Sequence, residues 1–226
     1  MKAMRVLEVA RPGRVDYEEA TRRQEALVER RGAGGADVLV LLEHPPVYTL
    51  GRGADPRFLG LAAGGPVPVV RTSRGGQVTY HGPGQLVGYP IVDLRAHRQD
   101  VRWYVRELEQ TLIDALGVFG IGAARRDGFP GVWVEEWRKI ASIGVGIRRW
   151  VTWHGFALNV ARDVSGFDAI TPCGIDGVRM TSIAREGGPD DVDAVADVVL
   201  GVFTRRFGYD AVRPIEWQAT AVEATA

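Results

Sequence analysis

Short apolar segments separated by turn residues dominate the chain and predict a protein rich in β-strands. Some of these segments alternate apolar and polar positions, and others are unbroken apolar runs of strand length. The predicted strands are residues 5–9, 38–42, 47–50, 67–71, 77–80, 86–92, 132–135, 139–148 and 153–160. The last three follow one another closely, so we expect them to pair as consecutive antiparallel strands.

Helical spacing of apolar residues is confined to three segments. The first begins near Tyr17 and ends at a glycine-rich stop, and the second starts after Asp100 and ends at Gly117. The third opens at Asp190 or Asp191, because either aspartate can accept hydrogen bonds from the free amides of a first helical turn. Few helices among many strands predict an α+β fold in which helices flank one large mixed β-sheet.

The composition is that of an ordinary globular domain. Hydrophobic residues make up 46% and charged residues 25% of the 226 residues, and 28 basic residues balance 28 acidic ones. A net charge of zero gives no reason to expect a nucleic acid partner. The first residues lack a signal-peptide core, and no run approaches the roughly 20 apolar residues that cross a bilayer. We therefore expect a cytoplasmic protein with one domain over residues 1–217 and a disordered tail over 218–226.

Lysine is rare in this chain, which makes its one internal lysine informative. Only Lys2 and Lys139 occur, against 26 arginines. Period-2 alternation places Lys139 on the same strand face as Ala141 and Ile143, and we expect that face to be buried. Unlike an arginine, a lysine in apolar surroundings can lose its proton, so the position suits an amine that titrates. The alternative is a lysine at the end of a strand, whose stem packs on the sheet while its amine reaches water.

The chain also has a single cysteine, Cys173, which follows a proline and precedes two nearby glycines. It can form neither an intrachain disulfide nor a zinc site that needs several thiolates. Structural cysteines are usually found within buried strands or helices, so a loop position favours a reactive thiol. The alternative is a small residue that suits a tight turn. An ammonium group beside the sulfur would favour the thiolate, and Lys139 can supply it only if the fold brings the two together.

The densest glycine segment of the chain, residues 71–85, also contains Arg74 and His81. Glycines let the main chain approach a ligand closely and expose amide hydrogens. The segment lacks the lysine of a phosphate-binding P-loop, and its last glycines miss the dinucleotide-binding spacing by one residue, so a nucleotide site is disfavoured. A hairpin with unusual turns is the alternative explanation for the glycines.

The predicted strand at 153–160 has two different faces. His154 is in register with Phe156 and Leu158, which predicts a half-buried histidine with satisfied hydrogen bonds. Gly155 and Ala157 lie on the opposite face, where small side chains could leave room for a slender acyl chain, although tight packing of the sheet explains them equally well. No cluster of histidines, cysteines or carboxylates has the spacing of metal ligands, so we expect no metal site.

Taken together, six segments of the chain resemble the lipoyl(octanoyl) transferases, enzymes of lipoate biosynthesis that use octanoyl-acyl carrier protein as donor. The segments are residues 44–52, 74–89, 128–134, 139–144, 154–160 and 172–183, in that order and covering most of the chain. The resemblance implies the α+β fold that biotin and lipoate protein ligases share. It also implies that residues 1–217 form one catalytic domain.

The resemblance further assigns roles to particular residues. Cys173 falls on the family's acyl-thioester cysteine, and Lys139 falls on the lysine that tunes it. The family's substrate-contacting segments fall on Arg74, Gly75, Gly76, Gln77, Val78, Thr79, Tyr80 and His81, on Ser142, Ile143 and Gly144, and on Gly155, Phe156 and Ala157. No cofactor is implied.

The partners that the resemblance implies are proteins. Octanoyl-acyl carrier protein would be the donor, and the acceptors would be the lipoyl domains of 2-oxoacid dehydrogenase E2 subunits and the glycine cleavage H protein. We expect no membrane partner and a monomeric enzyme.

Two other functions are compatible with parts of this pattern. An ATP-dependent lipoate–protein ligase of the same fold would need a lysine but no cysteine, because an adenylate rather than a thioester activates the acid. A non-catalytic acyl-binding module would keep an apolar slot, yet it would have no reason to retain both a loop thiol and a lysine that titrates. The sequence therefore favours the transferase.

Overall fold

A large mixed β-sheet forms the centre of the protein in the computed structural model, which describes residues 4–135, 137–175 and 177–217. Among these residues the sheet has nine strands, in the order β12-β1-β2-β6-β10-β9-β8-β7, with β11 paired to β9. The strands are β1 (Val6–Arg14), β2 (Asp37–Glu43), β6 (Gln85–Ile91), β7 (Ala124–Arg126), β8 (Phe129–Val134), β9 (Arg138–Arg148), β10 (Val151–Asn159), β11 (Arg179–Met180) and β12 (Ala211–Pro214). β1 runs parallel to both of its neighbours. The next strands across the sheet, in the order β2-β6-β10-β9-β8-β7, all pair antiparallel.

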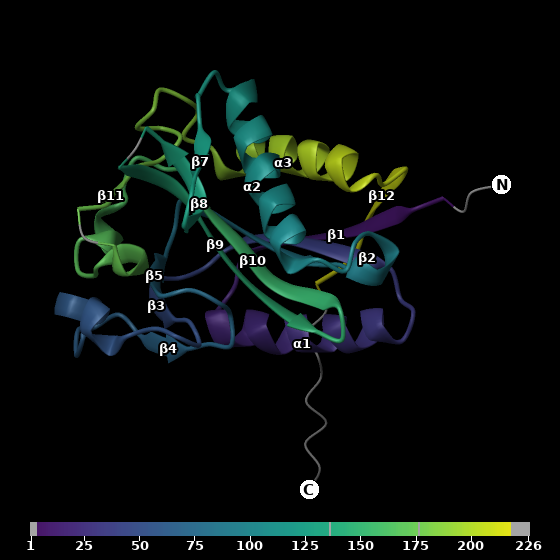
Figure 1. Cartoon of the computed structure of the whole chain (residues 1–226), viewed down its shortest axis with the longest axis horizontal. Coiled ribbons are helices and arrows are strands. Elements are labelled where there is room, and N and C mark those ends of the chain that lie inside the picture. The colour runs from purple at the N-terminus through teal and green to yellow at the C-terminus, as the bar shows by residue number, and fades with distance from the viewer. Residues whose placement is uncertain (1–3, 136, 176, 218–226) are drawn as a thin grey trace, which may run out of the picture.

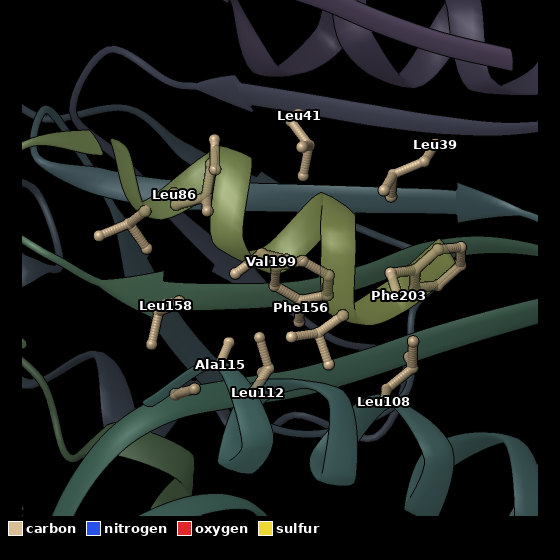
Figure 2. Packing of buried hydrophobic residues seen from close by; sticks show 14 of the residues in the cluster. Leu39, Leu41, Leu86, Leu108, Leu112, Ala115, Phe156, Leu158, Val199 and Phe203 are labelled. Atoms are coloured by element: carbon tan, nitrogen blue, oxygen red, sulfur yellow. The ribbon is translucent and has the colours of Figure 1, made fainter. Parts of the chain in front are cut away.

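Helices cover both faces of this sheet. They are α1 (Tyr17–Gly32), α2 (Val101–Val118) and α3 (Val192–Phe207). Figure 1 shows α2 and α3 on one side of the sheet and α1 on the other. Under α2 and α3 lies the larger core, where Leu112 and Phe203 from the helices pack with Phe156 of β10 (Figure 2). Under α1 lies a second core that includes Val28 and Val40.

The unbroken apolar run of β2 is explained by this arrangement. Leu39 and Leu41 belong to the core under α2 and α3, whereas Val38, Val40 and Leu42 belong to the core under α1. Since successive side chains of a strand point to opposite faces, a strand with helices on both sides needs apolar residues at every position. The run at 38–42 therefore marks a central strand.

An aspartate starts each of the three helices. Asp16, Asp100 and Asp191 each accept a hydrogen bond from one or two amides of the first helical turn. These bonds satisfy donors that have no partner within a helix, and the negative charge is favourable at the helix N-terminus. For α3, the structure selects Asp191 over Asp190 as the first capping residue.

Replacing the cap of α3 should reduce stability by a predictable amount. We expect Asp191→Ala to lower the free energy of unfolding by about 1 kcal/mol, because the amides of Asp193 and Ala194 lose their acceptor. Asp190→Ala is the matched control, since this exposed neighbour caps nothing, and it should change stability by less than about 0.5 kcal/mol. Urea denaturation measures both variants, and equal losses would contradict the assignment of the cap.

A smaller sheet lies beside the large one and carries the glycine-rich segment. It consists of β3 (Val47–Leu50), β4 (Val69–Arg71) and β5 (Val78–His81), in the order β4-β3-β5. One of its faces packs Tyr48, Leu50 and Val78 into a third apolar cluster. Short 3-10 turns complete the described chain at Pro56–Ala62, Leu94–Ala96, Ser165–Phe167 and Pro172–Gly174.

The α+β prediction is confirmed, and so are the predicted strands and helices, with ends that differ by a few residues. The first strand extends to Arg14, well beyond the predicted residue 9. Sequence patterning missed β7, β11 and β12, which have at most four residues and too few apolar positions to show a period. No helix in the described ranges is long and apolar enough to cross a membrane. The predicted tail 218–226 lies outside the described residues, and the single domain over 1–217 stays a prediction.

The prediction that Lys139 shares a strand face with Ala141 is wrong. Lys139 pairs with Trp133 and Ala141 pairs with Val132, which are neighbours on β8. Directly paired residues point to the same side of a sheet and neighbours to opposite sides, so Lys139 and Ala141 point to opposite sides. The cause is a β-bulge at Ile140, an extra residue that shifts the alternation. Lys139 is buried as predicted, with 2% of its surface exposed.

Candidate active site

A cavity of about 470 Å³ opens where the glycine-rich loop meets β9 and β10. Its volume is typical of small-molecule sites, and its wall is mostly apolar. The lining residues are Tyr17, Arg74, Gly75, Gly76, Gln77, Val78, Thr79, His81, Val87, Tyr89, Val105, Gly128, Phe129, Pro130, Lys139, Ser142, Ile143, Gly144, Val145, His154, Gly155, Phe156, Ala157, Cys173, Gly174 and Ile175. This set brings together all but one of the sequence-predicted site residues.

Tyr80 is the exception. The structure places its side chain outside the cavity lining, in the apolar cluster on the far face of the small sheet, where its ring lies 5.3 Å from Tyr48 and 5.5 Å from Phe167. Strand alternation explains the difference, because Thr79 and His81 face the cavity and the residue between them must face away. Tyr80 thus lies outside the cavity lining, and its contact with substrate stays a prediction.

The single cysteine and the internal lysine meet in the wall of this cavity. The Nζ atom of Lys139 lies 3.0 Å from the Sγ atom of Cys173, although 34 positions separate the two in sequence. The Lys139 amine also donates a hydrogen bond of 2.8 Å to the carbonyl oxygen of Pro130, and it lies 5.0 Å from the ring centroid of Trp133. The amine is therefore fixed in direction, with the thiol as one of its partners.

The bulge at Ile140 and the glycine at position 131 put the lysine there. The bulge turns Lys139 away from the face of Ala141 and toward the cavity. A Cβ atom on Gly131 would lie 2.6 Å from Cε of Lys139 and 2.5 Å from the carbonyl oxygen of Ala141. Since no real Cβ atom tolerates such distances, only glycine leaves room for the lysine stem beside β8.

A strained turn presents the cysteine. Cys173 has φ 59° and ψ 10°, a left-handed conformation that costs a non-glycine residue about 1–2 kcal/mol. The turn is held by its neighbours, because the amide of Thr171 donates to the carbonyl of Phe58, and the Phe58 ring packs against Gly174 so closely that a Cβ atom there would lie 2.7 Å away. Cys173 is half-buried and lines the cavity.

The glycine-rich loop is clamped between the two sheets. The amide of Gly75 donates to the carbonyl of Val145 on β9, and Nη2 of Arg74 donates to both oxygen atoms of Thr49 on β3, at 2.7 Å each. A Cβ atom on Gly144 would lie 2.8 Å from the carbonyl oxygen of Gly75. The glycine at 144 therefore allows the loop to lie directly on β9.

The ring of His154 does not lie on the face of β10 that the sequence predicts. Its φ of 53° breaks the alternation of β10, so its ring does not follow Phe156 and Leu158 into the core under α2 and α3. The ring stacks on Trp153 at 4.3 Å, and Nε2 lies 3.2 Å from the hydroxyl of Ser73. His154 is 1% exposed rather than half-buried, and its Nδ1 atom has no partner.

A cluster of buried aromatic and imidazole rings forms the wall under α1. His44 donates from Nδ1 to the carbonyl of Val15 and accepts at Nε2 from the hydroxyl of Tyr89. His81 stacks on Tyr17 at 5.7 Å and lies 5.6 Å from His44. Burial lowers the pKa of His44 to about 4 and that of His154 to about 3, and it lowers the pKa of His81 well below the ordinary value. These histidines are therefore neutral near pH 7.

The buried histidines make stability depend on pH below neutrality. In the unfolded chain a histidine takes up a proton near pH 6.5, whereas His44 and His154 stay neutral in the folded protein until about pH 4 and pH 3. Stability is therefore fully present above pH 6.5 and falls as the pH drops below it, by about 1.4 kcal/mol per pH unit for each histidine.

Urea denaturation between pH 6 and pH 4.5 measures this dependence. We expect His154→Gln to reduce the slope of unfolding free energy against pH by about one proton, because one of the groups that protonate on unfolding is gone. A variant slope equal to that of the unmodified protein would show that His154 is protonated in the folded state.

Sequence reasoning missed several cavity residues. Tyr17 was assigned only to a helix face, and Tyr89 only to a strand, because their periodic positions match ordinary core residues. His154 carried no sign of its positive φ beyond the glycine that follows it. No group of histidine, cysteine and carboxylate side chains among the described residues could hold a metal ion.

The amino-acid sequence is similar to a known family model and to individual octanoyltransferases. Residues 16–204 match the family model of the lipoyl protein ligase A/B catalytic domain. An octanoyltransferase of Gloeobacter violaceus is 50% identical over 199 residues, which cover 87% of this chain and 88% of that protein. An octanoyltransferase of Xanthomonas campestris pv. campestris is 47% identical over 196 residues, which cover 87% of this chain and 83% of that protein.

Solved structures match the fold at low sequence identity. A bi-partite lipoate protein ligase of Thermoplasma acidophilum superposes with a TM-score of 0.66 at 15% identity and covers 95% of this chain and 87% of that one. A biotin protein ligase of Aquifex aeolicus has a TM-score of 0.51 at 13% identity and covers 91% of this chain and 70% of that one. The expected likeness to lipoate and biotin protein ligases is confirmed for the fold.

Proposed function

The chain belongs to the octanoyltransferase family and has a lipoyl protein ligase A/B catalytic domain, and we propose that it carries the octanoyl group as a thioester on Cys173. The observation that supports this most is the 3.0 Å contact between the Lys139 amine and the Cys173 sulfur in the wall of an apolar cavity. A thiolate is the nucleophilic form of cysteine, and a neighbouring ammonium group stabilises it.

In the first step, the Cys173 thiolate attacks the carbonyl carbon of an octanoyl thioester on acyl carrier protein. The carbon–sulfur bond to the carrier breaks, and a new carbon–sulfur bond to Cys173 forms. The departing carrier thiolate takes a proton from the Lys139 ammonium, which leaves that lysine as a neutral amine. Because one thioester replaces another, the octanoyl group stays activated.

In the second step, the ε-amine of a lysine on a lipoyl domain attacks the enzyme thioester. Neutral Lys139 accepts the proton that the attacking nitrogen loses, and Cys173 departs as a thiolate beside the ammonium that has just formed. The amide product is more stable than the thioester, so the transfer needs no nucleotide. Lys139 thus donates a proton in one step and accepts one in the next.

The cavity would hold the acyl chain next to this pair. Ile143 of β9 and Phe156 of β10 give it apolar surface, and Gly155 and Ala157 add no bulk. Burial of each methylene is worth about 0.8 kcal/mol, so an eight-carbon chain gains substantial binding energy from such a wall. Because Cys173 is only half-buried, both protein partners can reach the carbonyl end of the chain that it carries.

The donor and acceptors proposed are octanoyl-acyl carrier protein and lipoyl domains. A nucleotide-free transfer assay tests this assignment against an ATP-dependent ligase. We expect the enzyme to octanoylate a lipoyl domain from octanoyl-acyl carrier protein without ATP, and to give no product from free octanoate with ATP and magnesium. Electrospray mass measurement of the lipoyl domain follows both reactions. Product only in the second reaction would contradict the proposed transferase mechanism.

A further inference from the structure

A buried arginine without a carboxylate partner lies in the same cavity. Arg74 is 7% exposed, and no carboxylate lies within ion-pair distance of it among the described residues. A buried charge is costly unless an opposite charge compensates it, and buried arginines are therefore usually paired. The position of Arg74 calls for an anion that the loop itself does not supply.

The hydrogen bonds of Arg74 fix the guanidinium without neutralising it. Nη2 donates to the carbonyl and the hydroxyl of Thr49, and Nη1 donates to the carbonyl of Gly75 at 3.0 Å. All of these acceptors are neutral. Nε is buried and has no partner at all. The glycines at 51 and 144 leave the room that this group occupies, since Cβ atoms there would lie 3.0 Å from Nη1 and 3.1 Å from Cδ of Arg74.

Other polar atoms in the cavity wall are also without partners. Besides Nε of Arg74, they are the Thr79 hydroxyl, the Ser142 hydroxyl and Nδ1 of His154. Buried polar atoms normally have partners, so their concentration in one wall marks a compartment built for a polar or charged group. The acyl chain alone cannot provide one.

Several titratable groups surround Arg74, and most of them are neutral near pH 7. Tyr17 comes from α1 and Tyr89 from β6, and burial raises the pKa of both phenols. His81 and His154 line the same cavity and His44 packs against His81, and burial lowers the pKa of each. The remaining ionisable cavity residues are Lys139, which is a cation when charged, and Cys173. The thiolate is thus the anion available to compensate Arg74.

We propose that Arg74 is a positioning residue whose buried positive charge holds Cys173 as a thiolate together with Lys139. The two cations have different duties. Lys139 must give up and regain its proton during transfer, whereas a guanidinium keeps its charge at any working pH. Arg74 thereby favours the thiolate even when Lys139 is neutral. The electrostatic interaction is reciprocal: burial lowers the pKa of Arg74, and a negative charge on Cys173 opposes that effect.

Alkylation of Cys173 by iodoacetamide, followed against pH, tests this role. The thiolate is the reactive form, and the chain has no second cysteine to interfere. We expect Arg74→Gln to move the midpoint of the rate curve to higher pH by about one unit, so that alkylation below the midpoint is about tenfold slower. Arg71→Gln removes an exposed arginine three residues away and is the matched control.

A folded Arg74→Gln protein whose alkylation curve overlays that of the unmodified enzyme would overturn the inference. If glutamine at this position prevents folding, Lys139→Met gives an independent measurement, since Arg74 is then the cation left in the cavity wall that Cys173 shares. We expect the alkylation midpoint of Lys139→Met below about 8.5, the value of a free cysteine. A midpoint at or above that value would overturn the inference as well.

The inference rests on the proposed role of Cys173, but the two fail in different experiments. Alkylation needs no octanoyl donor, so an unchanged curve in Arg74→Gln affects only the role of Arg74. Full transfer activity in Cys173→Ala would instead remove the proposed function, whatever the alkylation curve of Arg74→Gln shows.

Discussion

Cys173→Ala is expected to abolish octanoyl transfer, with a loss of at least about 10⁴-fold in kcat/KM. The variant keeps the cavity and Lys139 but has no atom that can bond to the acyl group. Single-turnover transfer from octanoyl-acyl carrier protein to a lipoyl domain measures the loss. Transfer at more than a few per cent of the original rate would show that the acyl group passes directly from donor to acceptor.

The same position offers a control for folding. Since Cys173 is half-buried in a turn, Cys173→Ala should change the free energy of unfolding by less than about 1 kcal/mol. Cys173→Gly should be inactive too, yet more stable than the alanine variant by about 1 kcal/mol, because glycine adopts the left-handed φ of 59° without strain. Inactive variants that are at least about as stable as the enzyme would exclude misfolding as the cause.

Lys139→Arg is expected to lower kcat by about 10³-fold although it conserves the positive charge. An arginine cannot give up its proton, so it cannot accept one from the attacking amine. The same single-turnover assay separates the two steps, and we expect the second, aminolysis, to be affected more than acylation.

Arg138→Lys, in the adjacent position, is the matched control for this exchange. Arg138 is partly exposed and forms ion pairs with Glu135 and Glu186. Because a lysine can form the same ion pairs and the pair with exposed Glu135 contributes little, the control should retain most of its activity. Activity close to that of the unmodified enzyme in Lys139→Arg would contradict proton transfer by Lys139 and leave it only an electrostatic role.

Much of the fold could be predicted from the sequence because burial imposes clear periods. The run at 38–42 predicted a strand, and Asp100 and the pair Asp190 and Asp191 marked the starts of two of the three helices. The short strands β7, β11 and β12 could not be found, since they owe their place to neighbours in the sheet rather than to their own apolar pattern. The bulge at Ile140 was equally hidden, because alternation assumes an unbroken pleat.

The reactive residues of the site could be predicted from the sequence, because thiol and amine chemistry each require a particular residue type. A single thiol and a single internal lysine stood out by rarity, and the structure brings them to 3.0 Å. Tyr17, Tyr89 and His154 were missed because their contribution depends on how distant segments meet. Their own spacing looks like ordinary core packing. The unpaired state of Arg74 also needed the structure, since no sequence pattern shows that a charged side chain lacks a partner.

Intact-mass measurement of the enzyme tests the central claim most directly. The protein is mixed with octanoyl-acyl carrier protein, without ATP and without an acceptor domain, and quenched in acid to preserve thioesters. We expect the enzyme to gain the mass of one octanoyl group in exchange for one proton, to lose it with hydroxylamine, and not to gain it as Cys173→Ala. An unmodified mass during turnover, or an octanoyl group that remains in the alanine variant, would contradict a thioester on Cys173.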